Sequence, residues 1–223
     1  MEEIIAEHSS IGEYQISDLV KTKFYQNFAL IFDVEPVFIN EESKILFLNQ
    51  LVFTLERDEN FLETGIYLND RKEGYWVEEN VQYDSLSEEK GKYHQGKKEG
   101  LWITWVDGQR WKEENYRNGQ QEGLTTIWYS NGQKASEGNY RNGKKEGLWI
   151  FWYKNGQKHS EGNYRNGEEE GLWLYWYDNG QKSEEGNYQN GEKERLWIYW
   201  HPNGQKHSEG NYRNGELINK TIF

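Results

Sequence analysis

The chain has 223 residues, no cysteine and a formal net charge of −12, and aromatic residues make up 16% of it. The absence of cysteine excludes a disulfide framework and a thiolate metal site, and the aromatic content excludes a disordered acidic chain. The first residues, MEEIIAEHSS, lack the basic and apolar regions of a signal peptide, and no stretch approaches 18 apolar residues, so we expect a cytoplasmic protein without a transmembrane helix.

Residues 1–62 are the most acidic part, with 4 Lys/Arg against 12 Asp/Glu. This excess argues against nucleic acid or an anionic membrane as a partner and suits a basic protein. The alternative is that the charge only keeps the protein soluble. The candidate partner-binding residues of this segment are Asp33, Glu35, Glu41, Glu42, Asp58 and Glu59.

The same segment has no period. Asp18 is suited to cap a helix that carries Leu19 and Phe24. The run 45–55 has apolar residues at both parities, so it is compatible with a strand or a helix. We interpret residues 1–62 as a small cap that covers the first edge of a sheet, because a bare edge invites aggregation.

Residues 63–223 are predicted to be a repeat array of about six units of roughly 24 residues with a truncated last copy. The tyrosines of a recurring G-x-Y element are spaced by 23 or 24 residues: Tyr93, Tyr116, Tyr140, Tyr164, Tyr188 and Tyr212. A degenerate earlier copy contains Gly65 and Trp76. A period of this length predicts a stacked array of small structural units.

Each unit contains two Asn-Gly steps, such as Asn142-Gly143 and Asn155-Gly156. Asn-Gly between short segments rich in Trp and Tyr predicts hairpins with type I′ turns. The predicted fold is therefore all-β: an elongated single antiparallel β-meander of stacked two-stranded repeats with a small N-terminal cap. At the far end, the last edge strand is expected to be formed, or to be covered, by Leu217, Ile218, Ile222 and Phe223.

Two-residue turns at both steps predict the pairing of the strands. Gly138 then faces Gly147, Ser136 faces Trp149, and Gly162 faces Trp149 from the other side. The alternation of side chains places Tyr140, Trp149 and Phe151 on one face. Leu148, Ile150 and Trp152 lie on the opposite face.

Two rows of aromatic residues run through the strands that contain L-W-I-x-W. The fifth position is tryptophan in every full copy: Trp105, Trp128, Trp152, Trp176 and Trp200. The second position is less strict, because Thr125 replaces the tryptophan in one copy. Repeat proteins bury the residue that they repeat most faithfully, so the invariant row is predicted to be the core. The alternative is an aromatic face that binds a partner or stacks against sugars.

The remaining polar residues show no catalytic pattern. His159 and His207 share a repeat position but lie four strands, about 19 Å, apart, which is too far to share a metal ion. Glutamates form two rows on an open surface, one with Glu137 and one with Glu146, and neighbours within a row are about 10 Å apart. The glycines fit turns and no phosphate-binding motif. We therefore predict a protein that is not an enzyme and has no cofactor and no metal site.

The segment EGNYRNGKKEGLWIFWYKNGQK at 137–158 and its copies resemble the MORN-repeat variant family, of the type known in bacteria as YwqK-like antitoxins. The resemblance covers roughly residues 64–223. Arg195 in place of the glycine of E-G-L-W, and Glu114 in place of the glycine of E-G-N-Y, depart from it. Either departure is expected to widen the strand packing locally.

The resemblance implies a β-meander used for interaction, and an antitoxin or immunity protein that neutralises a cognate toxin by direct binding. The acidic segment then selects a basic toxin. The alternatives are a structural scaffold without a toxin partner, association with a membrane surface, which the net charge opposes, and carbohydrate binding on the aromatic row.

Overall fold

The structure is a computed structural model that describes residues 52–58, 61–68, 71–82 and 85–223. Within these ranges every regular element is a β-strand and no helix occurs. The chain divides into two compact units. The first extends to Gly108 and includes Arg117–Gly119, and the second consists of Gln109–Tyr116 and Gln120–Phe223.

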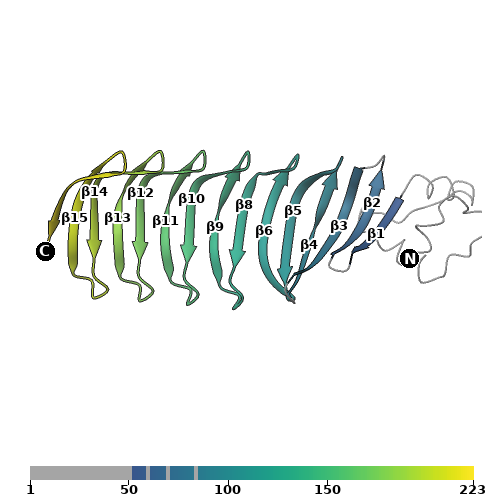
Figure 1. The fold of residues 1–223 in the computed structure, drawn as a ribbon, viewed down its shortest axis with the longest axis horizontal. Helices are drawn as coiled ribbons and strands as arrows, with labels where there is room; N and C mark the ends of the chain where they lie inside the picture. Colours follow the sequence, from purple (N-terminus) through teal and green to yellow (C-terminus); the bar gives the residue numbers. More distant parts are fainter. Residues whose placement is uncertain (1–51, 59–60, 69–70, 83–84) are drawn as a thin grey trace, which may run out of the picture. The chain divides into compact units, whose positions relative to one another are not determined.

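The first unit contains five strands, each paired antiparallel with the next along the chain (Figure 1). They are β1 (Val52–Asp58), β2 (Phe61–Leu68), β3 (Arg71–Gln82), β4 (Ser85–His94) and β5 (Lys97–Val106). The strand β1 begins inside the segment that the sequence suggests as a cap, and it supplies a ladder from Val52 to Asp58 against β2.

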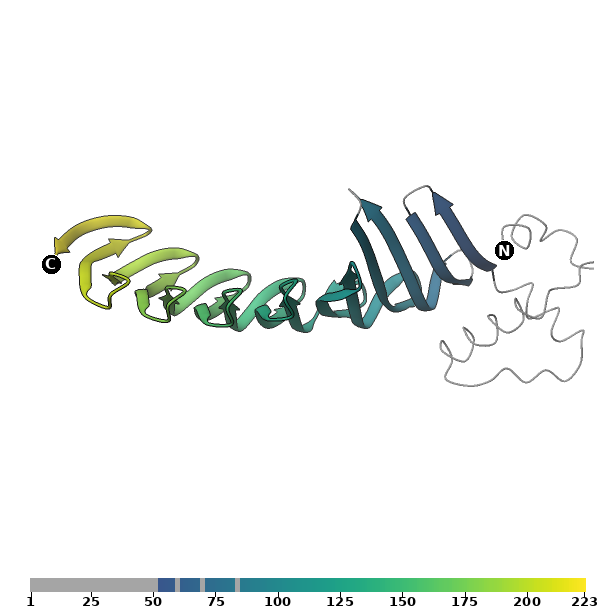
Figure 2. The ribbon, with the colours of Figure 1, turned by 90° about the horizontal axis from the view of Figure 1, so that it is seen from below.

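The second unit continues the same pattern in the order β6-β8-β9-β10-β11-β12-β13-β14-β15-β16, with β7 paired to β6. Figures 1 and 2 show the strands of this unit side by side in one layer. They are β6 (Gln109–Arg117), β7 (Gln120–Gln121), β8 (Gly123–Trp128), β9 (Lys134–Arg141), β10 (Lys144–Trp152), β11 (Lys158–Arg165), β12 (Glu168–Trp176), β13 (Lys182–Gln189), β14 (Glu192–Trp200), β15 (Lys206–Arg213) and β16 (Glu216–Ile222).

The predicted all-β antiparallel meander is confirmed, and so is a last strand that contains Leu217 and Ile222. The predicted helix that Asp18 caps, and residues 45–51 of the ambiguous apolar run, lie outside the described residues. Residues 52–55 of that run are part of β1. The division of the chain at residues 62 and 63 stays a prediction.

The two Asn-Gly steps of a repeat form different turns. Asn142 and Gly143 have φ angles of 52° and 74°, and Arg141 pairs with Lys144, so this step is the predicted two-residue type I′ turn. At the other step only Gly156 has a positive φ angle, of 83°. The amide of Gly156 donates to the carbonyl of Tyr153, and the amide of Tyr153 donates to the carbonyl of Gln157. The type I′ prediction is wrong there, because this loop has three residues with the glycine in the left-handed position.

The register prediction is correct on one side of β10 and wrong on the other. Trp149 pairs with Gly162 of β11, as expected. On the β9 side, Trp149 pairs with Gly138, where the sequence predicts Ser136. A bulge after Glu146 shifts the register, so Gly147 does not face Gly138. Gly147 has a φ angle of 69°, the left-handed conformation that such a bulge uses.

The prediction that the invariant tryptophan row forms the core is wrong. The buried tryptophans, each at most 2% exposed, are Trp76, Trp102, Trp149, Trp173 and Trp197. These residues occupy the second position of the L-W-I-x-W strand or its equivalent. The members of the fifth-position row are only half-buried. Fidelity of repetition therefore does not identify the buried residue here.

Candidate protein-interaction surface

Strand β10 defines the two faces of the second unit. Successive side chains of a strand point to opposite faces, so Trp149 and Phe151 share one face and Leu148, Ile150 and Trp152 share the other. The first is named the tyrosine face, because Tyr140 and Tyr164 flank Trp149 on it. The second is named the leucine face. Both assignments agree with the prediction from the sequence.

On the tyrosine face, the indole of Trp149 lies over Gly138 of the preceding strand, where a Cβ atom would overlap the ring. The ring of Tyr140 meets it edge-on at 5.2 Å, and Phe151 stacks on it at 5.9 Å. Its Nε1 donates to the carbonyl of Asn139 at 3.1 Å. Because Gly138 has no side chain, the indole fits against the backbone of the preceding strand. The neighbouring rings then cover the indole, although the sheet has only one layer.

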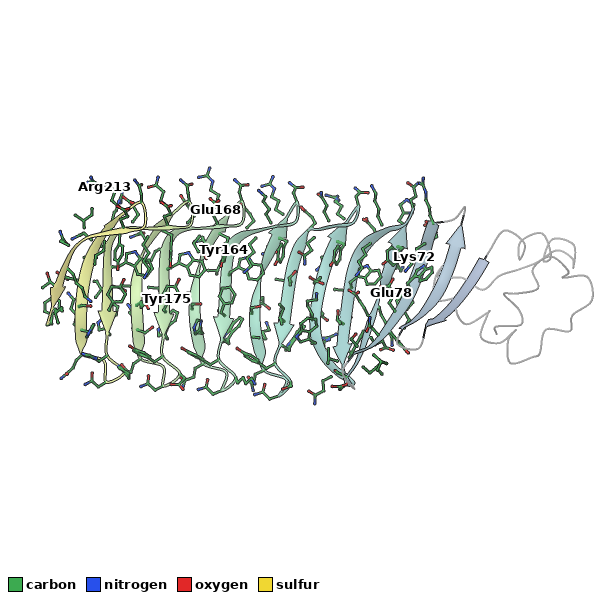
Figure 3. The ribbon with its side chains drawn as sticks, viewed as in Figure 1. Lys72, Glu78, Tyr164, Glu168, Tyr175 and Arg213 are labelled. Carbon is green, nitrogen blue, oxygen red and sulfur yellow. The ribbon has the colours of Figure 1, made fainter. Side chains whose placement is uncertain are left out.

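Charged groups complete the cover of the tyrosine face. The ammonium of Lys145 lies 4.4 Å from the centroid of the Trp149 ring, and burial lowers the pKa of Lys145. In the next repeat Glu169 stands at this position and accepts from the hydroxyl of Tyr164 at 3.2 Å. Tyr164 is labelled in Figure 3. Burial, with Glu169 as a second cause, raises the pKa of Tyr164. The phenol therefore stays protonated and acts as a donor at neutral pH.

The leucine face carries the largest apolar side chains that the second unit exposes in a regular row. The leucines of the E-G-L-W element and its variants are 41% to 53% exposed: Leu124, Leu148, Leu172 and Leu196. Neighbours in the row are two strands, about 10 Å, apart. A repeated row of exposed leucines on one face is a feature of interaction surfaces.

Four residues further along each strand, on the same face, lies the tryptophan row that the sequence suggests as an aromatic face. Each ring has a cation from the preceding strand over it, as Lys158 lies over Trp176 at 5.7 Å. That lysine is held by Glu161 at 2.5 Å on its own strand. The same arrangement combines Lys134 with Trp152, Lys182 with Trp200, Arg110 with Trp128 and, in the first unit, Lys90 with Trp105. The glutamate row that contains Glu137 and Glu161 thus positions cations over the rings.

The second glutamate row stabilises turns. A carboxylate oxygen of Glu146 accepts from the backbone amide of Asn166, at the type I′ turn of the next repeat, at 3.0 Å. Glu99, Glu122, Glu170 and Glu194 accept from the corresponding amides of Asn118, Asn142, Asn190 and Asn214. These carboxylates bind backbone amides of the protein itself, which explains the row without catalysis.

The repeat that contains β6 and β8 departs from this pattern. Glu113 pairs with Thr126, and the next step of this ladder places Glu114 opposite Thr125, where other repeats have glycine and tryptophan. Glu114 is only 4% exposed and is bound by Lys112, Tyr116 and Gln121. Thr125 is 2% exposed, and its hydroxyl has no hydrogen-bond partner within the described residues.

The two departures noted in the sequence have local effects. The ladder between β6 and β8 has two pairs and ends before Glu114, so the expected widening at this residue stays a prediction. Arg195 keeps the ladder, since it pairs with Tyr212 as Gly171 pairs with Tyr188. Its φ angle of 63° is the left-handed conformation that glycine adopts in the other copies. The pairing of β14 with β15 therefore shows no widening at Arg195. The substitution instead leaves the backbone of Arg195 in a strained conformation.

Of the acidic candidates, Asp58 lies at the end of β1, and the other five lie outside the described residues. These five are Asp33, Glu35, Glu41, Glu42 and Glu59. The structure therefore leaves their role a prediction. The feature that sequence reasoning missed is the leucine row, although the invariant leucine of E-G-L-W was its signal.

Comparison with known proteins identifies the class of repeat. Residues 121–142, 145–166, 169–190 and 196–214 match the model of the family described as MORN repeat variant. Repeats of this family are generally protein- or membrane-binding modules and are typically non-catalytic. The chain matches no curated protein. In the ranges that the structure describes, no helix has the length and apolarity needed to cross a membrane.

Proposed function

We propose that this chain is a cytoplasmic binding protein that neutralises a basic protein toxin by covering its surface, without chemistry of its own. The observation that supports binding is the leucine face, where four leucines at 41% to 53% exposure recur on successive repeats. The same face carries the half-buried tryptophan row, and tryptophan is a residue type enriched at protein interfaces.

Charge supports the choice of partner. The chain carries a net charge of −12, and 12 of its acidic residues lie in residues 1–62. Acidic groups that face a basic toxin accelerate association and disfavour wrong partners more than they strengthen the final complex. In this proposal the leucine face supplies contact area and the acidic segment supplies selectivity, because repeated surfaces distinguish partners poorly.

The test is co-expression with the product of the neighbouring gene in a sensitive host. Wild-type protein is expected to restore growth, and Leu172→Asp is expected to lose this protection while keeping its melting temperature, because the side chain is already 53% exposed. Gln189→Asp is the matched control, since it adds the same charge at an exposed position of the turn edge. Equal protection by both variants would exclude the leucine face as the binding surface.

A second experiment addresses the acidic segment. Neutralising Asp33, Glu35, Glu41 and Glu42 together is expected to slow association and to flatten its dependence on salt. Unchanged association would leave these residues a role only in solubility or in covering the sheet edge. If no neighbouring product is toxic, and the captured partners are structural proteins, the scaffold function replaces the antitoxin function.

A further inference from the structure

The hairpin between β14 and β15 brings two histidines together. His201 begins its loop and His207 follows it, six residues later. The amide of His201 donates to the carbonyl of Gln205, and the amide of Gly204 donates to the carbonyl of His201, both at 2.8 Å. This is the three-residue loop found at the same place in the preceding repeats, so the position of both histidines is determined by a regular element of the fold.

The two imidazole rings are in contact. Their centroids are 4.6 Å apart and their planes form an angle of 79°. Nδ1 of His207 lies 3.0 Å from Oγ of Ser208, a contact that orients the ring and leaves Nε2 available. His201 is exposed, and its ring has no hydrogen-bonded partner in the part of the chain that the structure describes.

We propose that His201 and His207 form a two-histidine site for a divalent transition-metal ion. With metal–nitrogen bonds of about 2.0–2.1 Å and angles at the metal of roughly 90° to 109°, the centroids of two imidazoles bound to one ion lie about 4.5–5.3 Å apart. The observed separation falls in this range. This site is independent of the proposed toxin-binding function.

The donor set defines the class of ion. Two neutral imidazoles suit Zn²⁺, Cu²⁺ and Ni²⁺, and Cu²⁺ binds most tightly to nitrogen ligands in this series. Among the described residues, no group of three or more His, Cys, Asp or Glu side chains is placed to hold a metal ion. Water completes the coordination of the bound ion, which makes this an open and weaker site than a closed four-ligand one.

The other repeats provide a built-in comparison. The pair that corresponds to His201 and His207 is Tyr153 and His159 two repeats earlier, with ring centroids 4.8 Å apart and planes at 81°. The geometry is the same, but a phenol replaces one imidazole. The hairpin between β12 and β13 has Tyr177 and Ser183 at these positions. Of these hairpins, only the one between β14 and β15 offers two imidazole nitrogens.

The test is calorimetric titration of the full-length protein with Zn²⁺, together with electron paramagnetic resonance of Cu²⁺ to count nitrogen ligands. His201→Tyr and His207→Ser introduce residues that the chain itself uses at these positions. Each is expected to weaken binding at this site by about tenfold or more, because the second imidazole is held at a high effective concentration. His159→Ala is the matched control and is expected to bind as the wild type does.

A gain of function completes the test. Tyr153→His gives the earlier hairpin the same pair, and it is expected to add a second ion of similar affinity. Circular dichroism of each variant shows whether the fold is retained, and the gain of a site does not depend on the stability of the loss variants. Wild-type protein that binds no Zn²⁺ or Cu²⁺, or equal losses in His207→Ser and His159→Ala, would overturn the proposal.

Discussion

In the hairpins β9–β10, β11–β12 and β13–β14, an indole lies over a glycine of the preceding strand: Trp149 over Gly138, Trp173 over Gly162 and Trp197 over Gly186. Between β6 and β8, Thr125 and Glu114 occupy the same two places. Thr125 is smaller than the tryptophan of the other repeats, and Glu114 is larger than their glycine. Tryptophan and glycine are exchanged together here, because an indole and a Cβ atom cannot share the same space.

The exchange changes the chemistry of the buried site. A Trp149-type site is closed by rings and by one indole N–H bond. The Glu114 site holds a carboxylate that needs three polar partners, and the hydroxyl of Thr125 has none within the described residues. Burying such groups costs free energy that a well-packed ring site does not require. The hairpin of β6 and β8 is therefore expected to be less stable than the hairpin of β9 and β10.

The largest effect is expected from removing a buried indole. Trp149→Ala should lower the free energy of unfolding by about 3–5 kcal/mol, because it leaves a cavity under the neighbouring rings. Trp152→Ala should cost roughly half as much, since that side chain is only half-buried. Urea denaturation of both variants measures the difference. Equal costs would contradict the assignment of the second-position row as the core.

A smaller loss is expected at the glycine. Gly162→Ala places a Cβ inside the ring of Trp173 and should cost about 1–3 kcal/mol through overpacking. The same substitution in a Trp173→Ala background is the control, because the ring that it would overlap is gone. A cost that persists in that background would mean that backbone conformation, and not the ring, requires glycine there.

The exchange itself is tested by a double-mutant cycle. Thr125→Trp alone should destabilise the protein because its ring meets Glu114, and Glu114→Gly alone should destabilise it by opening a void and leaving Lys112 without its carboxylate. The double variant restores the common pair. We expect a favourable coupling of about 0.5–3 kcal/mol in thermal or urea unfolding. Additive effects would show that the two positions do not pack against each other.

Arg195 replaces a glycine of the repeat without a second substitution that compensates for it, unlike Glu114, which is accompanied by Thr125. Its φ angle of 63° suits glycine, so Arg195→Gly should stabilise the protein by about 1 kcal/mol. The reciprocal change Gly171→Arg, at a φ angle of 72°, should destabilise it by a similar amount. A shift of the melting temperature measures both. A loss of stability in Arg195→Gly would mean that the side chain makes stabilising contacts that exceed the strain.

The smallest effect concerns the glutamates that bind turn amides, which are present both in the repeat of β6 and β8 and in the repeat of β9 and β10. Glu122 and Glu146 accept from the turn amides of Asn142 and Asn166 at 2.8 and 3.0 Å. Replacing either by alanine should cost about 0.5–1.5 kcal/mol, the usual net value of one hydrogen bond. Hydrogen exchange at the two asparagine amides should report the loss locally. Unequal costs would mean that the site of Glu114 influences the Asn142 turn of the next repeat, which Glu122 binds.

Sequence reasoning predicted the fold well and the candidate surface only in part. The period of the G-x-Y tyrosines and the Asn-Gly steps was sufficient for an antiparallel meander, because turn chemistry and alternation are local properties. The core row was predicted incorrectly, since Trp152 recurs more faithfully than Trp149. The bulge at Gly147 moves Trp149 opposite Gly138, and nothing in the spacing of the turns indicates this shift.

The sequence by itself determined the strands, most of the turns and the two faces of each strand, because each depends on residues within a few positions of one another. The tertiary structure decided which tryptophan is buried, what the glutamate rows bind and that His201 meets His207. These outcomes depend on the bulge and on contacts between neighbouring repeats, 20 to 24 residues apart, or across a hairpin loop. Register across strands is a collective property of the paired backbone, and a linear pattern does not contain it.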